Sequence, residues 1–182
     1  MSSILYIASD LPLSARPNPH DRMVSVNEAL AMGITNLPSY LMAEGFDKDR
    51  PQVLLVSDRE VSINVDTGVI EDGNFDDDFA IRPCPKEPGM RTSKQYCAEL
   101  EWVRYTPGRA DQVIGYLKGH LLHTHEIELW HIWLDDQPGH RLSVSRQSIH
   151  RLKAEDIQRL EQTDVFAIPP TDHCCLITGN PS

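Results

Sequence analysis

The sequence predicts an α+β protein whose C-terminal half forms a ferredoxin-like βαββαβ sandwich. Apolar residues change from period two to helical spacing and back between residues 97 and 134. The same order of strand, helix and strand is repeated over residues 142–178, which gives the split arrangement of that sandwich. The N-terminal half is expected to add short helices and strands. The sequence leaves open whether those strands join the C-terminal sheet.

The clearest element boundaries lie in the middle of the chain. Residues 97–105 alternate between apolar and polar side chains, which predicts a half-buried strand. Thr106 and Pro107 follow, and these residue types are typical of the N-cap and of the first helical position, so a helix is predicted to begin here. Residues 127–134 are apolar on both faces, which predicts a central strand.

Shorter elements are predicted on both sides of this stretch. The predicted strands are 4–8, 53–56, 61–65 with a hairpin, 79–82, 142–144 and 174–178. Three short helices are also predicted. The first begins after Ser25 and ends at Gly33, the second covers 38–44 and the third covers 153–162. Residues 10–21 are interpreted as a proline-rich loop, and 72–74 as a turn. Asp76–Asp78 lacks the spacing of a calcium loop and is interpreted as a solvated turn.

The length of 182 residues suits one well-buried domain over residues 1–182. An alternative is a division into 1–92 and 93–182. Residues 83–93 contain three prolines and a glycine, and they are the linker that this division would use.

Charge and hydropathy exclude several classes of partner. The net charge of −10 disfavours binding to nucleic acid, because an acidic chain repels the phosphate backbone. The sequence has no apolar run near the ~20 residues that span a bilayer, so no membrane association is expected. The N-terminus has no basic segment before its apolar run, which favours the cytoplasm over secretion. An acidic surface suits a basic protein partner.

A histidine cluster is the sharpest candidate metal site. The candidate ligands are His120, His123, His125 and His131, with Glu126 or Glu128 as an additional oxygen ligand. His120 and His123 lie one helical turn apart, a spacing that can place two imidazoles on one zinc ion. The alternative is structural: histidines at a helix C-terminus interact favourably with the helix dipole, and His131 alternates with apolar residues as a core histidine does.

The four cysteines are predicted to be free thiols, because none forms a CxxC pair and no secretion signal is present. The run Asp172-His173-Cys174-Cys175 could supply a nucleophile and its base, or soft metal ligands. The favoured interpretation is that Cys174 and Cys175 are buried in the last strand.

The opening Ile4-Leu5-Tyr6-Ile7-Ala8-Ser9-Asp10, followed by Pro12-Leu13, resembles the start of a set of small uncharacterised bacterial proteins. The run from Glu126 to Trp130 before an acidic turn is similar as well. The resemblance implies a cytoplasmic bacterial protein and brings no activity with it. Many members of the set have a Cys/Gly-rich segment where this chain has only Cys97.

The sequence therefore favours a non-enzymatic binding or protein-interaction module of the bacterial cytoplasm, with no cofactor. One version is an acidic protein that neutralises a basic partner, as toxin-immunity proteins do. The alternative is a zinc-dependent enzyme built on the histidine cluster. No phosphate loop, dinucleotide fingerprint or nucleophile elbow supports any other enzyme class.

Overall fold

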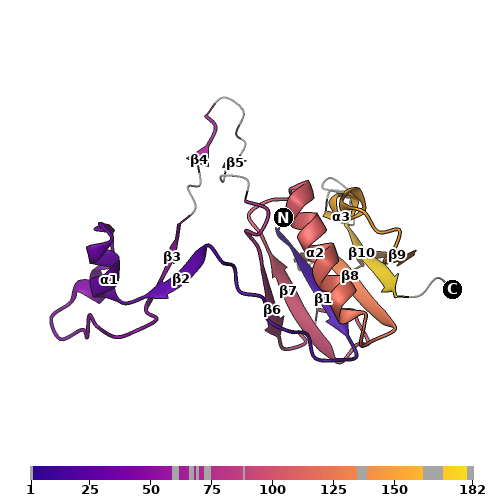
Figure 1. The fold of residues 1–182 in the computed structure, drawn as a ribbon, viewed down its shortest axis with the longest axis horizontal. Coiled ribbons are helices and arrows are strands. Elements are labelled where there is room, and N and C mark those ends of the chain that lie inside the picture. The colour runs from indigo at the N-terminus through magenta and orange to yellow at the C-terminus, as the bar shows by residue number, and fades with distance from the viewer. Residues whose placement is uncertain are drawn as a thin grey trace. The chain divides into compact units, whose positions relative to one another are not determined.

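The computed structural model of the chain describes residues 2–58, 62–65, 68, 70–71, 75–87, 89–134, 139–161 and 170–179. Its main feature is a six-stranded mixed sheet in the order β6-β7-β1-β8-β10-β9 (Figure 1). The strands are β6 Ala80–Cys84, β7 Tyr96–Glu101, β1 Ser2–Ser9, β8 Glu126–Leu134, β10 Thr171–Thr178 and β9 Arg141–Ser148. Neighbouring strands are antiparallel except β9 and β10, which are parallel.

The α+β class is confirmed, whereas the ferredoxin-like arrangement is not. The sheet is larger than that of a βαββαβ unit, because β1 lies between β7 and β8 and β6 adds to one edge. The position of β1 follows from its sequence: residues 5–8 are apolar and buried on both faces, which suits a central strand. The N-terminus of the chain thus joins the C-terminal sheet.

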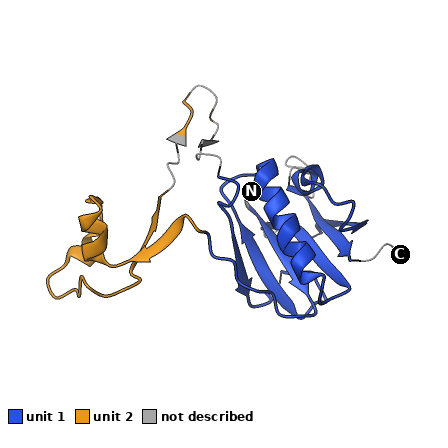
Figure 2. Ribbon diagram, in the orientation of Figure 1, with its two compact units in different colours: residues 1–18, 74–182 blue, residues 19–73 orange. Residues whose placement is uncertain are grey.

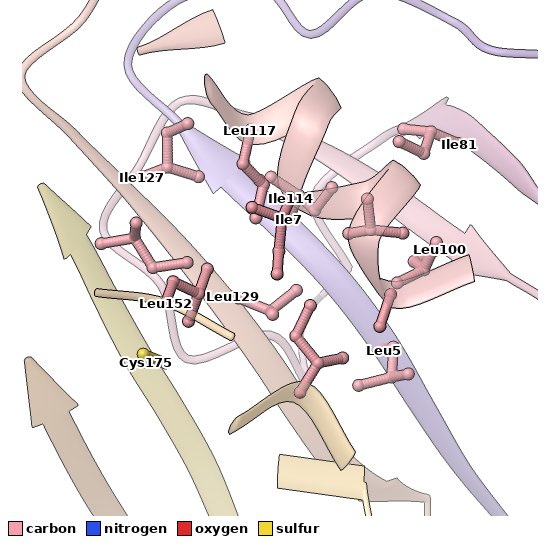
Figure 3. Packing of buried hydrophobic residues seen from close by; sticks show 14 of the residues in the cluster. Leu5, Ile7, Ile81, Leu100, Ile114, Leu117, Ile127, Leu129, Leu152 and Cys175 are labelled. Atoms are coloured by element: carbon pink, nitrogen blue, oxygen red, sulfur yellow. The ribbon is translucent and has the colours of Figure 1, made fainter. Parts of the chain in front are cut away.

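Two helices, α2 (Pro107–His120) and α3 (Ala154–Glu161), contribute buried residues to the larger core on one face of this sheet. In Figure 3, Ile114 and Leu117 of α2 lie against Ile7 of β1 and Leu129 of β8. The predicted start of α2 is confirmed, since the Thr106 side chain accepts a hydrogen bond from the Arg109 amide at 3.1 Å. The predicted central strand at 127–134 is confirmed as β8, which pairs with β1 and β10.

The opposite face of the sheet has a smaller core. Tyr6 and Trp130 stack there with ring centroids 5.7 Å apart. Met90 packs into this core, and Thr92 donates a hydrogen bond to Glu128 at 2.5 Å. Trp130 Nε1 donates to the same carboxylate at 2.7 Å. The connection between β6 and β7 is therefore anchored to the sheet by buried contacts.

A buried ion pair joins the N-terminus of α2 to the segment before β6. Asp78 Oδ2 lies 3.0 Å from Arg109 Nη2, and both side chains are fully buried. Asn18 donates to the other Asp78 oxygen at 2.6 Å, and Arg109 also donates to the carbonyls of Phe75 and Arg104. The solvated turn predicted at 76–78 is thus wrong for Asp78, because a specific cation and amide compensate its burial.

The chain divides into two compact units, coloured in Figure 2: unit 1 comprises residues 1–18 and 74–182, and unit 2 comprises 19–73. Unit 2 holds β2 (Asp21–Val24), α1 (Val26–Ala31), the 3-10 helix η1 (Ser39–Met42), β3 (Leu54–Ser57), β4 (Ser62–Ile63) and β5 (Ile70–Glu71). The single-domain prediction and its alternative division at 83–93 stay predictions; residues 83–93 belong to unit 1.

Most other predicted elements are confirmed. Strands form at 4–8, 53–56, 79–82, 142–144 and 174–178, and the predicted hairpin is the antiparallel pair β4–β5. The loop predicted at 10–21 is partly wrong, because Arg16 pairs with Ile81 and β2 begins at Asp21. The predicted turn at 72–74 lies outside the described residues. In the described ranges, no helix has both the length and the apolar character needed to cross a membrane.

Candidate functional site

The structure keeps three of the four histidines of the predicted metal site near the end of α2, where His120 and His123 line one cavity and His123 and His125 line another, and it places His131 elsewhere. His120 is the last residue of α2, and its Nε2 is hydrogen-bonded to Ser9 Oγ at 2.8 Å. Burial, and secondarily His123, lowers the pKa of His120 below its usual value. His123 and His125 are exposed and line a cavity of about 610 Å³ at the end of α2 together with His150. His150 was not predicted, because the turn after β9 brings it there from a distant part of the sequence.

His131 lies far from this cavity. It is six residues beyond His125 along β8, and a strand rises ~3.3 Å per residue, so the two are separated by about 20 Å. His131 is buried on the helix-covered face, opposite His173 of β10, and its ring is 5.0 Å from that of Trp133. Among the described residues, neither ring nitrogen of His131 has a hydrogen-bond partner. Burial lowers its pKa.

The two glutamates suggested as oxygen ligands are engaged elsewhere. Glu128 faces the opposite side of β8 from His131 and accepts hydrogen bonds from Thr92 and Trp130. Glu126 lies 3.4 Å from Lys94 and 3.2 Å from Arg146. In the part of the chain that the structure describes, no group of three or more His, Cys, Asp or Glu side chains is placed to hold a metal ion.

The Asp172–Cys175 run is part of β10 and does not form a nucleophile with its base. Asp172 lies 3.1 Å from Arg91 and accepts a hydrogen bond from the Trp133 amide at 3.1 Å. Cys174 and Cys175 point to opposite faces of the sheet, and both are buried. Burial raises the pKa of Cys174 to about 12, so its thiol is protonated at neutral pH. The interpretation of both residues as buried strand cysteines is confirmed.

Unit 2 contains a second candidate site, an apolar groove beside β3. The sequence starts α1 with a capping box, in which Ser25 and Glu28 bond to each other's backbone amides. Gly33 follows the helix with a φ of +82°, a conformation that glycine adopts without strain. This turn directs residues 34–38 back toward β3. One wall of the groove is formed by Ala29, Ile34, Asn36, Leu37 and Pro38, and the other by Leu54–Ser57; the volume is about 330 Å³.

Unit 2 also exposes more large apolar side chains than it buries. Of its described residues, only four apolar residues are fully buried: Val24, Val26, Ala29 and Leu41. Seven are exposed: Met23, Met32, Tyr40, Met42, Leu55, Ile63 and Val65. Met23 and Leu55 lie directly opposite each other on β2 and β3, with 46% and 57% of their surface exposed. A unit of this size with so small a core gains little stability from its own apolar surface.

Unit 2 is strongly acidic. Residues 19–73 contain 10 acidic and 4 basic side chains, a net charge of −6 out of −10 for the whole chain. The exposed carboxylates among its described residues are Glu28, Glu44, Asp47, Asp49 and Asp58. The sequence shows the acidity of the first half, but it does not show the apolar groove, because the groove depends on how β3 and the loop after α1 are placed.

Comparison with protein-family models, with curated proteins and with solved structures found no match to this chain. The assignment of a function therefore rests on the site geometry.

Proposed function

We propose that this chain is a non-enzymatic interaction module of the bacterial cytoplasm that binds a basic protein partner through unit 2. The supporting observation is the seven exposed large apolar side chains on a unit that buries four. Two of them, Met23 and Leu55, are adjacent across the β2–β3 pair, and exposed apolar patches mark interaction sites in soluble proteins. Neutralisation of a basic toxin is one version of this function.

Methionine is prominent on this surface. Met23, Met32 and Met42 are three of the five methionines of the chain. Unbranched, polarisable side chains adapt their shape to a partner, and they are common at binding surfaces for that reason. The negative charge of unit 2 accelerates encounter with a basic protein and selects against acidic ones.

The metal-dependent enzyme has less support. His123 and His125 share a cavity with His150, but the described residues hold no ligand set for a metal ion. The zinc hypothesis stays a prediction that elemental analysis tests.

The test of the proposed function is co-purification from an extract of the source cells, followed by quantitative mass spectrometry. The test variant is Met23→Ser/Leu55→Ser. Its matched control is Leu142→Ser/Val144→Ser, because these two residues of β9 in unit 1 are exposed to the same degree, 48% and 55%.

We expect the native protein and the control to recover the same basic protein in equal amount. The Met23→Ser/Leu55→Ser variant should recover at least about tenfold less, since burying a Leu or Met side chain contributes about 1.5–3 kcal/mol. Recovery should also fall between about 0.05 M and about 0.5 M salt. Equal recovery by both variants, or an acidic partner that is insensitive to salt, would contradict the proposal.

A further inference from the structure

The cavity of about 610 Å³ at the end of α2 belongs to unit 1, and the function proposed for unit 2 does not use it. Its volume lies within the ~300–1,000 Å³ that is usual for small-molecule sites. We propose that this cavity binds a small organic anion, a molecule that carries a phosphate or carboxylate group on an apolar body. The proposal concerns unit 1 alone, so it is independent of the partner proposed for unit 2.

Main-chain hydrogen bonds join the three segments that form the cavity. The Gly179 amide, just after β10, donates to the carbonyl of His125 in the turn after α2 at 3.3 Å. The amide of Ile149, just after β9, donates to the carbonyl of Thr178 at the end of β10 at 2.9 Å. Backbone contacts between segments distant in sequence thus hold the walls of the cavity together.

The cavity is lined by five side chains that can donate hydrogen bonds: Lys118, His123, Thr124, His125 and His150. Within the described ranges, none of these five side chains has a hydrogen bond or an ion pair to another residue. A ligand can therefore reach all five groups without breaking an interaction inside the protein.

The charge of the lining favours an anion as the ligand. Of the described residues that line the cavity, none is acidic, although the whole chain has 27 acidic and 17 basic side chains. Glu126, the next residue after the turn, lies 3.4 Å from Lys94 and 3.2 Å from Arg146. Lys118 is positively charged. An imidazole donates a hydrogen bond in its neutral form and adds a positive charge when it is protonated.

The C-terminus of α2 acts against an anion, because the helix dipole places roughly half a negative charge there. The carbonyls of Leu117, Gly119 and His120 already accept hydrogen bonds from the amides of residues 121–123. Lys118, in the last turn of the helix, contributes a full positive charge. The lysine charge therefore exceeds the opposing charge of the helix end.

The apolar part of the lining indicates an organic ligand. This part consists of Leu121, Leu122 and Ile149. Leu121 and Ile149 belong to the larger core, whereas Leu122 is 82% exposed. A ligand whose apolar body covers Leu122 gains affinity because it removes this surface from water. An inorganic anion would leave the apolar wall uncovered.

The experiment uses the full-length chain in a buffer that contains EDTA. Four probes carry one aromatic ring each: phenyl phosphate, benzoate, benzyl alcohol and benzylamine. Inorganic phosphate is the fifth probe. Binding is followed by backbone amide chemical shifts and by titration calorimetry. Phenyl phosphate and benzoate differ in their anionic group, so the tighter of the two identifies the group that the cavity selects.

We expect one or both aromatic anions to bind at least about tenfold more tightly than the other three probes, because only these two ligands use both the donors and the apolar wall. The largest amide shifts should lie between residues 118 and 125 and at His150. Lys118→Gln should weaken binding at least about fivefold, and Lys118→Arg should retain it.

The matched control is Lys86→Gln, which removes one lysine charge at an exposed position after β6, at the opposite edge of the sheet from β9. This variant should bind the anion as the native chain does. Met23→Ser/Leu55→Ser should also bind it normally, because both changes lie in unit 2.

Equal affinity for the aromatic anions and for benzyl alcohol would overturn the proposal, as would equal affinity of Lys118→Gln and Lys86→Gln. Anion binding that is absent in EDTA and appears only with added zinc would also overturn it, because the imidazoles would then hold a metal ion rather than the anion itself.

Discussion

The buried pair of Asp78 and Arg109 leads to a quantitative prediction. Both side chains are fully buried, with Oδ2 and Nη2 3.0 Å apart. Asp78→Ala would remove the buried carboxylate that lies beside the buried Arg109 guanidinium inside unit 1. Removal of one partner of a buried ion pair costs about 3–5 kcal/mol, so we expect the free energy of unfolding to fall by that amount.

Two further variants separate the ion pair from simple loss of packing. Arg109→Met should lower the free energy of unfolding by a similar amount, because it removes the cation that lies beside the buried Asp78 carboxylate. The double variant Asp78→Ala/Arg109→Met should cost less than the sum of the single changes, by about 0.5–3 kcal/mol. Asp78→Asn keeps an acceptor for Asn18 and should fall between the native chain and Asp78→Ala.

An exposed ion pair provides the control. Arg82 Nε and Glu101 Oε2 lie 2.9 Å apart, almost the same separation, but the two side chains are 55% and 37% exposed. Arg82→Ala should therefore change stability by less than about 1 kcal/mol. Urea unfolding followed by tryptophan fluorescence is the assay, because all three tryptophans lie in unit 1. An Asp78→Ala variant as stable as Arg82→Ala would refute the argument from burial.

Three further predictions concern titration, thiol reactivity and metal. Burial lowers the pKa of His131 in the folded chain below the value of about 6.5 that the unfolded chain has. Between these two pKa values the unfolded chain binds more protons, so the free energy of unfolding falls as the pH falls through this window. His131→Leu should remove this part of the pH dependence of thermal unfolding, and an unchanged pH profile would contradict the prediction. Iodoacetamide should label the half-buried Cys84 before the buried Cys174, as peptide mass spectrometry can show; the reverse order would contradict the assigned burial. Elemental analysis should find no stoichiometric metal in the native protein, whereas about one equivalent that disappears in His120→Ala/His123→Ala would support the zinc hypothesis.

The strands and helix ends that depend on neighbouring residues could be predicted from the sequence. The strand at 127–134 is apolar on both faces because both faces of β8 are covered by packed side chains. The helix α2 has its cap and its first-turn proline in adjacent positions, so its start is defined within two residues. Cys174 and Cys175 occupy opposite faces of one strand, as period two requires.

Features that depend on distant partners were not predictable in the same way. Nothing near residue 78 in the sequence indicates that Arg109 will compensate a buried aspartate. Three consecutive acidic residues therefore predict a turn exposed to solvent. The place of β1 between β7 and β8 depends on pairing across long stretches of chain, which residue periodicity does not encode. His150 joins His123 and His125 only because strand pairing places the turn after β9 beside the end of α2.

The hydrogen bond between Asn18 and Asp78 has a consequence for how this protein can change over evolutionary time. It joins residues 60 positions apart at 2.6 Å, at the points where the chain leaves unit 1 and returns to it. The segment between them is thus an insertion in unit 1 whose two ends lie close together. The free energy of loop closure rises only ~0.6 kcal/mol for each doubling of loop length, so insertions of different length should change the stability of the six-stranded sheet only slightly. Under the proposed function, exchange of residues 19–73 would change the binding surface while the sheet, its helices and its buried ion pair stay as they are.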